Sequence, residues 1–284
     1  MEVFNTYNMK KKLLNLKVRI LRLLGDLFII SPLIHNYIEP INQPRSKVLV
    51  VGVVLQDRKN HYKHISSIFN DSKCHNVDQI WAVLKSHEKF EPINNVKHIY
   101  IDEFIPRSKL INTLIEGHIN KSYDYIVITD DDIRLPNGFV DQFLMRQEEF
   151  NFSLAQPART PDSIISHQIT KQNRNILARQ TLFVEIGPLV SIRRDAQELI
   201  LPLDEKSPMG WGLDYVWPVL IEEDNKKMGV IDCTPIAHTL RPVGKSYDAG
   251  KAVKEMSDFL ASRTHLSAGE AHVVLNTYHY LQKV

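Results

Sequence analysis

The sequence predicts an α/β fold in which a mainly parallel sheet is flanked by helices. Short apolar runs rich in β-branched residues alternate with segments of helical period, the pattern of βαβ units. The first run, Lys47–Leu55, is almost continuously apolar, as expected for a strand buried on both faces. We expect the other elements of this half to be strands at 77–84, 96–101 and 123–129 and helices at 61–70 and 107–121.

Length and composition are those of an ordinary globular protein. The 284 residues suffice for one large α/β domain or two small ones, and 43% are hydrophobic and 24% charged. A formal net charge of +2 argues against a nucleic-acid-binding protein, which normally shows a strong basic excess. Cys74 and Cys233 fit no zinc or redox spacing, so we expect reduced thiols and a cytoplasmic location.

The first 46 residues are expected to lie outside the catalytic domain. Leucine and isoleucine recur every three or four residues from Leu13 to Leu27, which predicts an amphipathic helix with a basic polar face. Such a helix would contact anionic lipid peripherally, or pack its apolar face on the domain or on a second subunit. The uncharged run 27–38 is too short to span a bilayer, which needs roughly 20 apolar residues.

The rest of the chain divides into two expected parts. A proline-containing linker at 39–46 precedes the catalytic domain, 47–249, and a C-terminal helical extension, 250–284, packs on that domain. Apolar spacing predicts two helices in the extension, one around Phe259 and one from Ala271 to Leu281. The expected elements between 139 and 237 are helices at 139–150, 194–201 and 216–227 and strands at 152–156, 182–192 and 229–237.

Polar and charged residues fill the stretch 159–181, which we expect to be a long loop of the kind that often carries function. Arg174 and Arg179 in this stretch could face a diphosphate or could be solvated surface charges. Glu185 lies inside the strand expected at 182–192, where an unpaired carboxylate would be costly to bury. We therefore expect Glu185 to be the partner of a site cation or an edge residue.

Three consecutive carboxylates, Asp130, Asp131 and Asp132, follow the strand expected at 123–129. Charges this close repel one another, and a divalent cation among them removes the repulsion. Ligands of open α/β sheets also bind outside the carboxyl ends of the strands. The triplet therefore predicts a metal site at the mouth of the sheet, with an acidic solvated loop as the simpler alternative.

Two later segments also carry candidate site residues. Glycines flank Trp211, and Asp214 follows near an expected helix N-terminus, where an ionised carboxylate is favoured. A helix cap beside a core tryptophan is the simpler interpretation of that segment. His238 follows the strand expected at 229–237, and neutral imidazole is a common ligand of transition metals. Because the chain has 12 histidines, a structural role for this one is the simpler alternative.

Taken in order, the acidic triplet, the segment Gly210–Asp214 and the strand-borne His238 resemble the motifs of GT-A-type nucleotide-sugar glycosyltransferases. The chain looks similar in particular to a poorly characterised branch with DDDI, GWGLD and late-histidine motifs, over roughly residues 47–245. This resemblance implies a GT-A-like, Rossmann-related single catalytic domain. It also implies a divalent cation, Mn²⁺ or Mg²⁺, that binds the diphosphate of the sugar donor.

The resemblance implies metal and donor roles for the triplet. Asp130 and Asp132 match the DxD motif, and His238 matches the histidine that completes the metal shell in several branches. Asp132 is the expected direct metal ligand, and Asp130 is expected to contact the ribose or a metal-bound water. Asp131 is a carboxylate beyond the minimal motif and is assigned to the donor, which leaves the division of roles within the triplet open.

The resemblance also implies the acceptor side of the site. Asp214 matches the acid that serves as general base in inverting members. Trp211 offers a flat face for an acceptor sugar, with Gly212 beside it. Asp57 and Arg58, directly after the first strand, are further candidates for donor contact.

These assignments predict an inverting hexosyltransferase that moves a sugar from a nucleotide-sugar donor to a glycan or lipid-linked acceptor. A basic N-terminus suits acceptors at the cytoplasmic membrane face, as in bacterial surface polysaccharide synthesis. One alternative is a haloacid-dehalogenase-like phosphatase with Asp130 and Asp132 as its aspartate pair, although that family's motif normally ends the first strand. Another is a non-catalytic sugar- or metal-binding protein on a degenerate transferase fold, against which the intact Asp214 argues.

Overall fold

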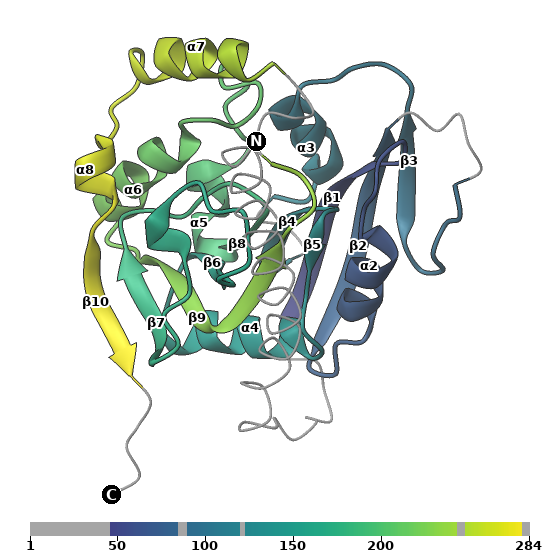
Figure 1. Cartoon of the computed structure of the whole chain (residues 1–284), viewed down its shortest axis with the longest axis horizontal. Coiled ribbons are helices and arrows are strands. Elements are labelled where there is room, and N and C mark those ends of the chain that lie inside the picture. The colour runs from purple at the N-terminus through teal and green to yellow at the C-terminus, as the bar shows by residue number, and fades with distance from the viewer. Residues whose placement is uncertain (1–45, 85–89, 120–122, 243–247, 280–284) are drawn as a thin grey trace, which may run out of the picture.

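A ten-stranded sheet organises the computed structural model, which describes residues 46–84, 90–119, 123–242 and 248–279 (Figure 1). The strand order is β10-β7-β9-β6-β8-β4-β1-β2-β3, and β5 pairs with β9 beside this path. The amphipathic helix and linker expected at 1–46 lie, except for Ser46, outside the described residues. Among the described helices, none is long and apolar enough to cross a bilayer.

The N-terminal half of the sheet is parallel, as expected. Strand β1 lies between β2 and β4 and is parallel to both, and β3 is parallel to β2. Val48, Leu49, Val50 and Val51 of β1 are fully buried because helices cover both faces of the sheet. The elements of this half are β1 (Ser46–Leu55), α2 (Tyr62–Asn70), β2 (His75–Leu84), β3 (Lys97–Ile101), α3 (Arg107–Ile115) and β4 (Tyr125–Asp130).

Antiparallel pairs extend the sheet in its C-terminal half. Strand β8 runs antiparallel to both β4 and β6, β7 runs antiparallel to β9, and β10 runs antiparallel to β7. Strands β6 and β9 are parallel. The elements are β5 (Ile133–Arg134), α4 (Phe139–Glu149), β6 (Leu154–Arg159), η2 (Gln168–Thr170), β7 (Ile176–Thr181), β8 (Leu189–Arg193), α5 (Arg194–Ile200), α6 (Leu213–Glu223), β9 (Met228–His238), α7 (Ala249–Leu260), α8 (Ala268–Ala271) and β10 (Val274–His279).

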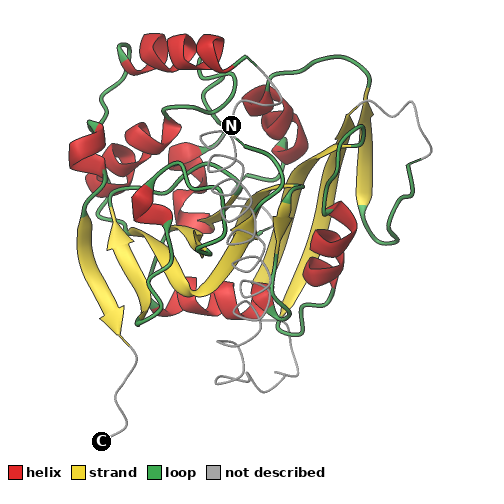
Figure 2. Ribbon diagram, in the orientation of Figure 1, coloured by secondary structure: helices red, strands yellow, loops and turns green. Residues whose placement is uncertain are grey.

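Helices lie on both faces of the sheet (Figure 2), and a hydrophobic core lies on each face. Alternate residues of β4 point to opposite faces, so that Ile126 and Ile128 belong to one core and Tyr125 and Val127 to the other. Helices α3, α5 and α6 complete the first core, and α2 and α4 complete the second. This arrangement fixes the carboxyl ends of the parallel strands in one row, where the candidate site lies.

Three expected elements are wrong, for related reasons. The stretch 159–181 is not a structureless loop, because β7 occupies its last residues, and the strand expected at 182–192 begins only at Leu189. The charge of Arg179 favoured the prediction of an exposed loop, but its guanidinium pairs with buried Asp232 of β9 at 2.9 Å. The helix expected at 271–281 is instead β10, since pairing with β7 outweighs its helical apolar spacing.

Candidate active site

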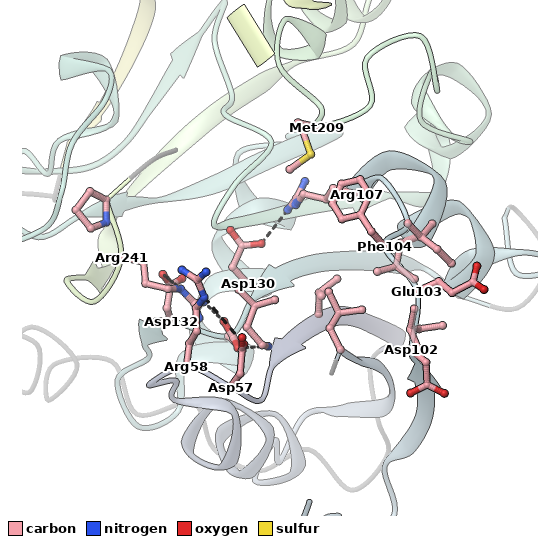
Figure 3. Close-up of a pocket in the computed structure, with 18 of the residues that line it drawn as sticks. Asp57, Arg58, Asp102, Glu103, Phe104, Arg107, Asp130, Asp132, Met209 and Arg241 are labelled. Atoms are coloured by element: carbon pink, nitrogen blue, oxygen red, sulfur yellow. Dashed lines mark hydrogen bonds and ion pairs between the residues drawn. The ribbon is translucent and has the colours of Figure 1, made fainter. Parts of the chain in front are cut away.

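A cavity of about 330 Å³ opens at the carboxyl ends of four neighbouring parallel strands (Figure 3). Its wall includes the end residue of each strand: Asp130 of β4, Leu55 of β1, Leu84 of β2 and Ile101 of β3. Asp57 and Arg58, which follow β1, also line the cavity, and Arg58 Nε lies 4.0 Å from Asp57 Oδ1. The lining therefore combines apolar strand-end residues with charged side chains.

Asp132 and His238 are brought together, as the sequence predicts. Strands β5 and β9 pair with Ile133 opposite His238, which places the imidazole Nε2 3.1 Å from the Asp132 Oδ2. Arg241 Nε also donates to Asp132 Oδ2 at 3.0 Å. Burial opposes ionisation of Asp132, but the hydrogen bonds and charges of these two partners outweigh it and lower the Asp132 pKa.

The other two aspartates are held apart from this pair. Asp131 is buried, and its Oδ2 accepts a hydrogen bond from the Leu55 amide at 2.7 Å while Oδ1 accepts one from Arg241. Burial raises the pKa of Asp131 to about 7. Asp130 is the most accessible of the three, with a side chain 33% exposed, and its Oδ1 accepts from Arg107 Nη2 at 3.0 Å. Each aspartate therefore has a different environment.

The chemistry of Asp132 and His238 fits a cation such as Mn²⁺. A carboxylate oxygen and an imidazole nitrogen in hydrogen-bond contact are a donor pair that such ions accept. Within the described residues, no group of three or more histidine, cysteine, aspartate or glutamate side chains forms a metal site. Asp132 and His238 would hold the ion, and water or phosphate oxygens would complete its coordination. Arg241 would have to release Asp132.

Two cavity arginines, Arg107 and Arg241, were not identified in the sequence. Arg107 donates a hydrogen bond to Asp130, and Arg241 donates to Asp131 and Asp132. In each arginine the Nη1 atom is buried without a hydrogen-bond partner among the described residues. Arg107 is the first residue of α3, a position with no sequence signal. Arg241 follows His238 by three residues, so the proximity to a candidate ligand was the one available indication.

Asp214 lies in the first turn of α6 and does not line the cavity. The side chain is buried, and its Oδ1 has no hydrogen-bond partner within the described part of the chain. Burial, and secondarily the charge of Glu185, raise the pKa of Asp214 to about 8. A carboxyl group in this state is protonated at neutral pH and ionises just above it.

The glycines of the Gly210–Asp214 segment are explained by packing. Both have positive φ, +86° at Gly210 and +93° at Gly212, which L-residues rarely adopt. A Cβ on Gly212 would lie 3.1 Å from Met256 of α7, so this residue faces the C-terminal extension. Trp211 is half-buried, does not line the cavity, and its carbonyl accepts a hydrogen bond from Ser207 at 2.7 Å.

Glu185 is neither an edge-strand residue nor a member of the triplet cluster. Its Oε2 accepts from Arg159 Nη2 at 2.6 Å, and the same nitrogen donates to the Gly187 carbonyl at 2.5 Å. Arg159 Nη1 lies 3.4 Å from His238 Nδ1. The buried guanidinium therefore connects the Glu185 region to the Asp132–His238 pair. Arg174 and Arg179, which could have faced a diphosphate, do not line the cavity.

Solved glycosyltransferase structures share this architecture. GalNAc-T7 with UDP, GalNAc and Mn²⁺ superposes with a TM-score of 0.51 at 10% identity, over 70% of this chain and 44% of that one. Residues 1–349 of S. aureus TarS superpose with a TM-score of 0.51 at 10% identity, over 76% of this chain and 64% of that one. The chain thus spans less than two thirds of either structure, and its fold is the GT-A fold of nucleotide-sugar glycosyltransferases.

No protein-family model and no curated protein matches the sequence. The GT-A fold confirms the expected fold class, an α/β domain with helices on both sides of a sheet that is parallel at its centre. It gives no support to the haloacid-dehalogenase alternative.

Proposed function

We propose that this protein is a metal-dependent, inverting hexosyltransferase that uses a nucleotide-sugar donor and a glycan or lipid-linked acceptor. The observation that carries the proposal is the cavity across four parallel strand ends of a GT-A fold, with Asp132, His238 and Arg241 at one end. Three strand spacings give this row a length of roughly 14 Å. We assign the diphosphate to the β4 end and the nucleoside to the β2–β3 end.

The charge of the cavity supports a requirement for a cation. Acidic side chains outnumber basic ones six to three in its lining: Asp57, Asp102, Glu103, Asp130, Asp131 and Asp132 against Arg58, Arg107 and Arg241. A diphosphate adds further negative charge, which such a lining would repel. A divalent cation held by Asp132 and His238 would reverse this repulsion and stabilise the charge of the leaving diphosphate.

Arg107 and Arg241 are assigned to the phosphate oxygens. Both residues line the cavity, their buried Nη1 atoms have no hydrogen-bond partner among the described residues, and guanidinium groups bind phosphates through charge-assisted hydrogen bonds. Asp130 holds Arg107 in place through the 3.0 Å contact. The sequence-based assignment of Asp130 to the ribose or to a metal-bound water is retained as part of the proposal, since this carboxylate is partly exposed.

Asp214 is assigned the role of general base. Its raised pKa, about 8, is close to physiological pH, where a base combines useful basicity with a substantial ionised fraction. The acceptor hydroxyl would lose its proton to Asp214 as it attacks the sugar from the face opposite the leaving diphosphate. Met209, five residues before Asp214, lines the donor cavity.

The proposed parts of the chain are the catalytic domain 47–249 and the extension 250–284, with residues 1–46 as a peripheral membrane contact. Donor binding tests the proposal first. In a thermal-shift screen of UDP-, GDP- and dTDP-sugars, at least one donor should raise the melting temperature of the wild type in Mn²⁺ and not in EDTA. D132N should lose this shift, whereas D258N, which changes an exposed aspartate of α7, should keep it.

Two results would contradict the proposal. Shifts of equal size in Mn²⁺ and EDTA would contradict metal-dependent donor binding. No shift with any nucleotide sugar would contradict the use of a nucleotide-sugar donor. Donor binding without hydrolysis or transfer would instead favour a non-catalytic sugar-binding protein on this fold.

A further inference from the structure

Four rings form a cluster beside Asp214, and none of them belongs to the lining of the donor cavity. Phe183 lies at its centre, with ring centroids 4.6 Å from His167, 4.7 Å from His272 and 5.5 Å from Tyr215. Phe183 is fully buried, His167 and Tyr215 are half-buried, and His272 is exposed. The ring cluster therefore has a buried base and an accessible rim of rings that carry polar atoms.

Backbone contacts fix the C-terminal extension against this cluster. Tyr215 lies in α6, and His272 directly follows α8, which is beside α6 in Figure 1. The Leu266 amide donates to the Tyr215 carbonyl at 3.0 Å, and the Leu182 amide donates to the Val273 carbonyl at 3.2 Å. The position of the exposed imidazole is thus set by hydrogen bonds on both sides of it.

Two carboxyl groups border the ring cluster. The negative charge of Glu185 acts on the pKa of His167, His272, Tyr215 and Asp214, so this carboxylate is near all four. Arg159 binds only one of its oxygens. The Asp214 Oδ1 is buried and has no hydrogen-bond partner within the described residues, a state that needs an explanation, and a hydroxyl of a bound ligand would supply one.

The ring cluster is also connected to the donor site. Arg159 spans from Glu185 to His238 Nδ1, and His238 contacts Asp132. Gly187, two residues after Glu185, backs Asp130, since a Cβ there would lie 3.2 Å from its Oδ2. A ligand on the rim of the ring cluster would therefore be next to the end of the cavity that we assign to the diphosphate.

We propose that His167, Tyr215 and His272 form the platform that binds the acceptor saccharide, and that Glu185 and Asp214 accept hydrogen bonds from its hydroxyls. Saccharides combine an apolar C–H face, which packs on flat rings, with hydroxyl donors that carboxylates accept. This inference rests on the proposed function and extends it, because it makes the C-terminal extension part of acceptor selection.

Saturation-transfer NMR on the full chain tests the platform. The probes are the p-nitrophenyl β-glycosides of glucose, galactose, N-acetylglucosamine and N-acetylgalactosamine. At least one should bind the wild type, and H272A should weaken that binding by about tenfold. H279A is the matched control, because His279 is an exposed histidine of the same extension on β10, outside the ring cluster, and it should bind like the wild type.

The outcomes separate this inference from the proposed function. No binding of any glycoside to the wild type, or equal binding to H272A and wild type, would overturn the platform, while Mn²⁺-dependent donor hydrolysis would still support a transferase. Glycoside binding that depends on His272, without donor hydrolysis, would support the platform and count against the transferase. H272Q removes the ring but keeps side-chain length, and provides the same test if H272A fails to fold.

Discussion

Replacing Asp214 with asparagine tests the proposed chemical role of this carboxyl group. Asparagine keeps the shape of the side chain and can still accept the backbone hydrogen bonds of the first turn of α6, but it cannot take a proton. A positioned general base contributes about 10²- to 10⁴-fold to a reaction rate. We therefore expect D214N to lose at least about 100-fold in the transfer rate while it retains donor binding.

The pH dependence of the transfer rate tests the same assignment. Because the Asp214 pKa is about 8, the wild-type rate should rise with pH and reach half its limit near pH 8. The assay is the initial rate of nucleoside diphosphate release between pH 6 and 9.5, with saturating donor, Mn²⁺ and an acceptor. An acidic limb centred near pH 4, or a D214N rate within a few-fold of wild type, would refute the assignment.

The raised pKa of Asp214 also makes the free energy of unfolding depend on pH. Between about pH 4 and pH 8 the folded chain holds a proton on Asp214 that the unfolded chain has released, so the folded state binds more protons. The free energy of unfolding should therefore fall as pH rises through this range. Urea denaturation at pH 6 and pH 8 should show a smaller difference for D214N than for wild type. D258N should behave as wild type.

Three further variants test the packing and the charges. G52A should lower the free energy of unfolding by about 1–3 kcal/mol in urea denaturation, because its Cβ would lie 2.4 Å from the Trp81 ring. R179A should lower it by about 3–5 kcal/mol, because it leaves Asp232 buried without its ion pair. R241A should raise the donor KM about tenfold or more, through loss of a charge-assisted phosphate contact, while the melting temperature without donor shows whether folding is retained.

Local sequence pattern was sufficient for the parts of the fold that depend on burial. The apolar run of β1 and the acidic end of β4 predict strands, and the GT-A fold confirms the parallel arrangement. The proximity of Asp132 and His238 was implied by the resemblance to GT-A glycosyltransferases, and the β5–β9 pairing accounts for it. These features rest on one strand or one short motif at a time.

Features that depend on distant partners could not be predicted. Arg179 lies in a strand although its stretch is polar, because Asp232, far away in sequence, neutralises it inside the sheet. The residues of β10 have the apolar spacing of a helix, but they form a strand because they pair with the edge of the sheet at β7. Arg107 and Arg241 reach the triplet from two separate segments. No local signal contains such information.

Release of nucleoside diphosphate from nucleotide sugars tests the central claim most directly. Wild type and D132N would be incubated with UDP-, GDP- and dTDP-sugars, in Mn²⁺ and in EDTA, and the free diphosphate measured. We expect release by the wild type from at least one donor in Mn²⁺, none in EDTA, and at least about 100-fold less by D132N, consistent with the size of electrostatic contributions to such steps. Equal release by wild type and D132N, or release that EDTA leaves unchanged, would contradict a metal-dependent transferase centred on Asp132.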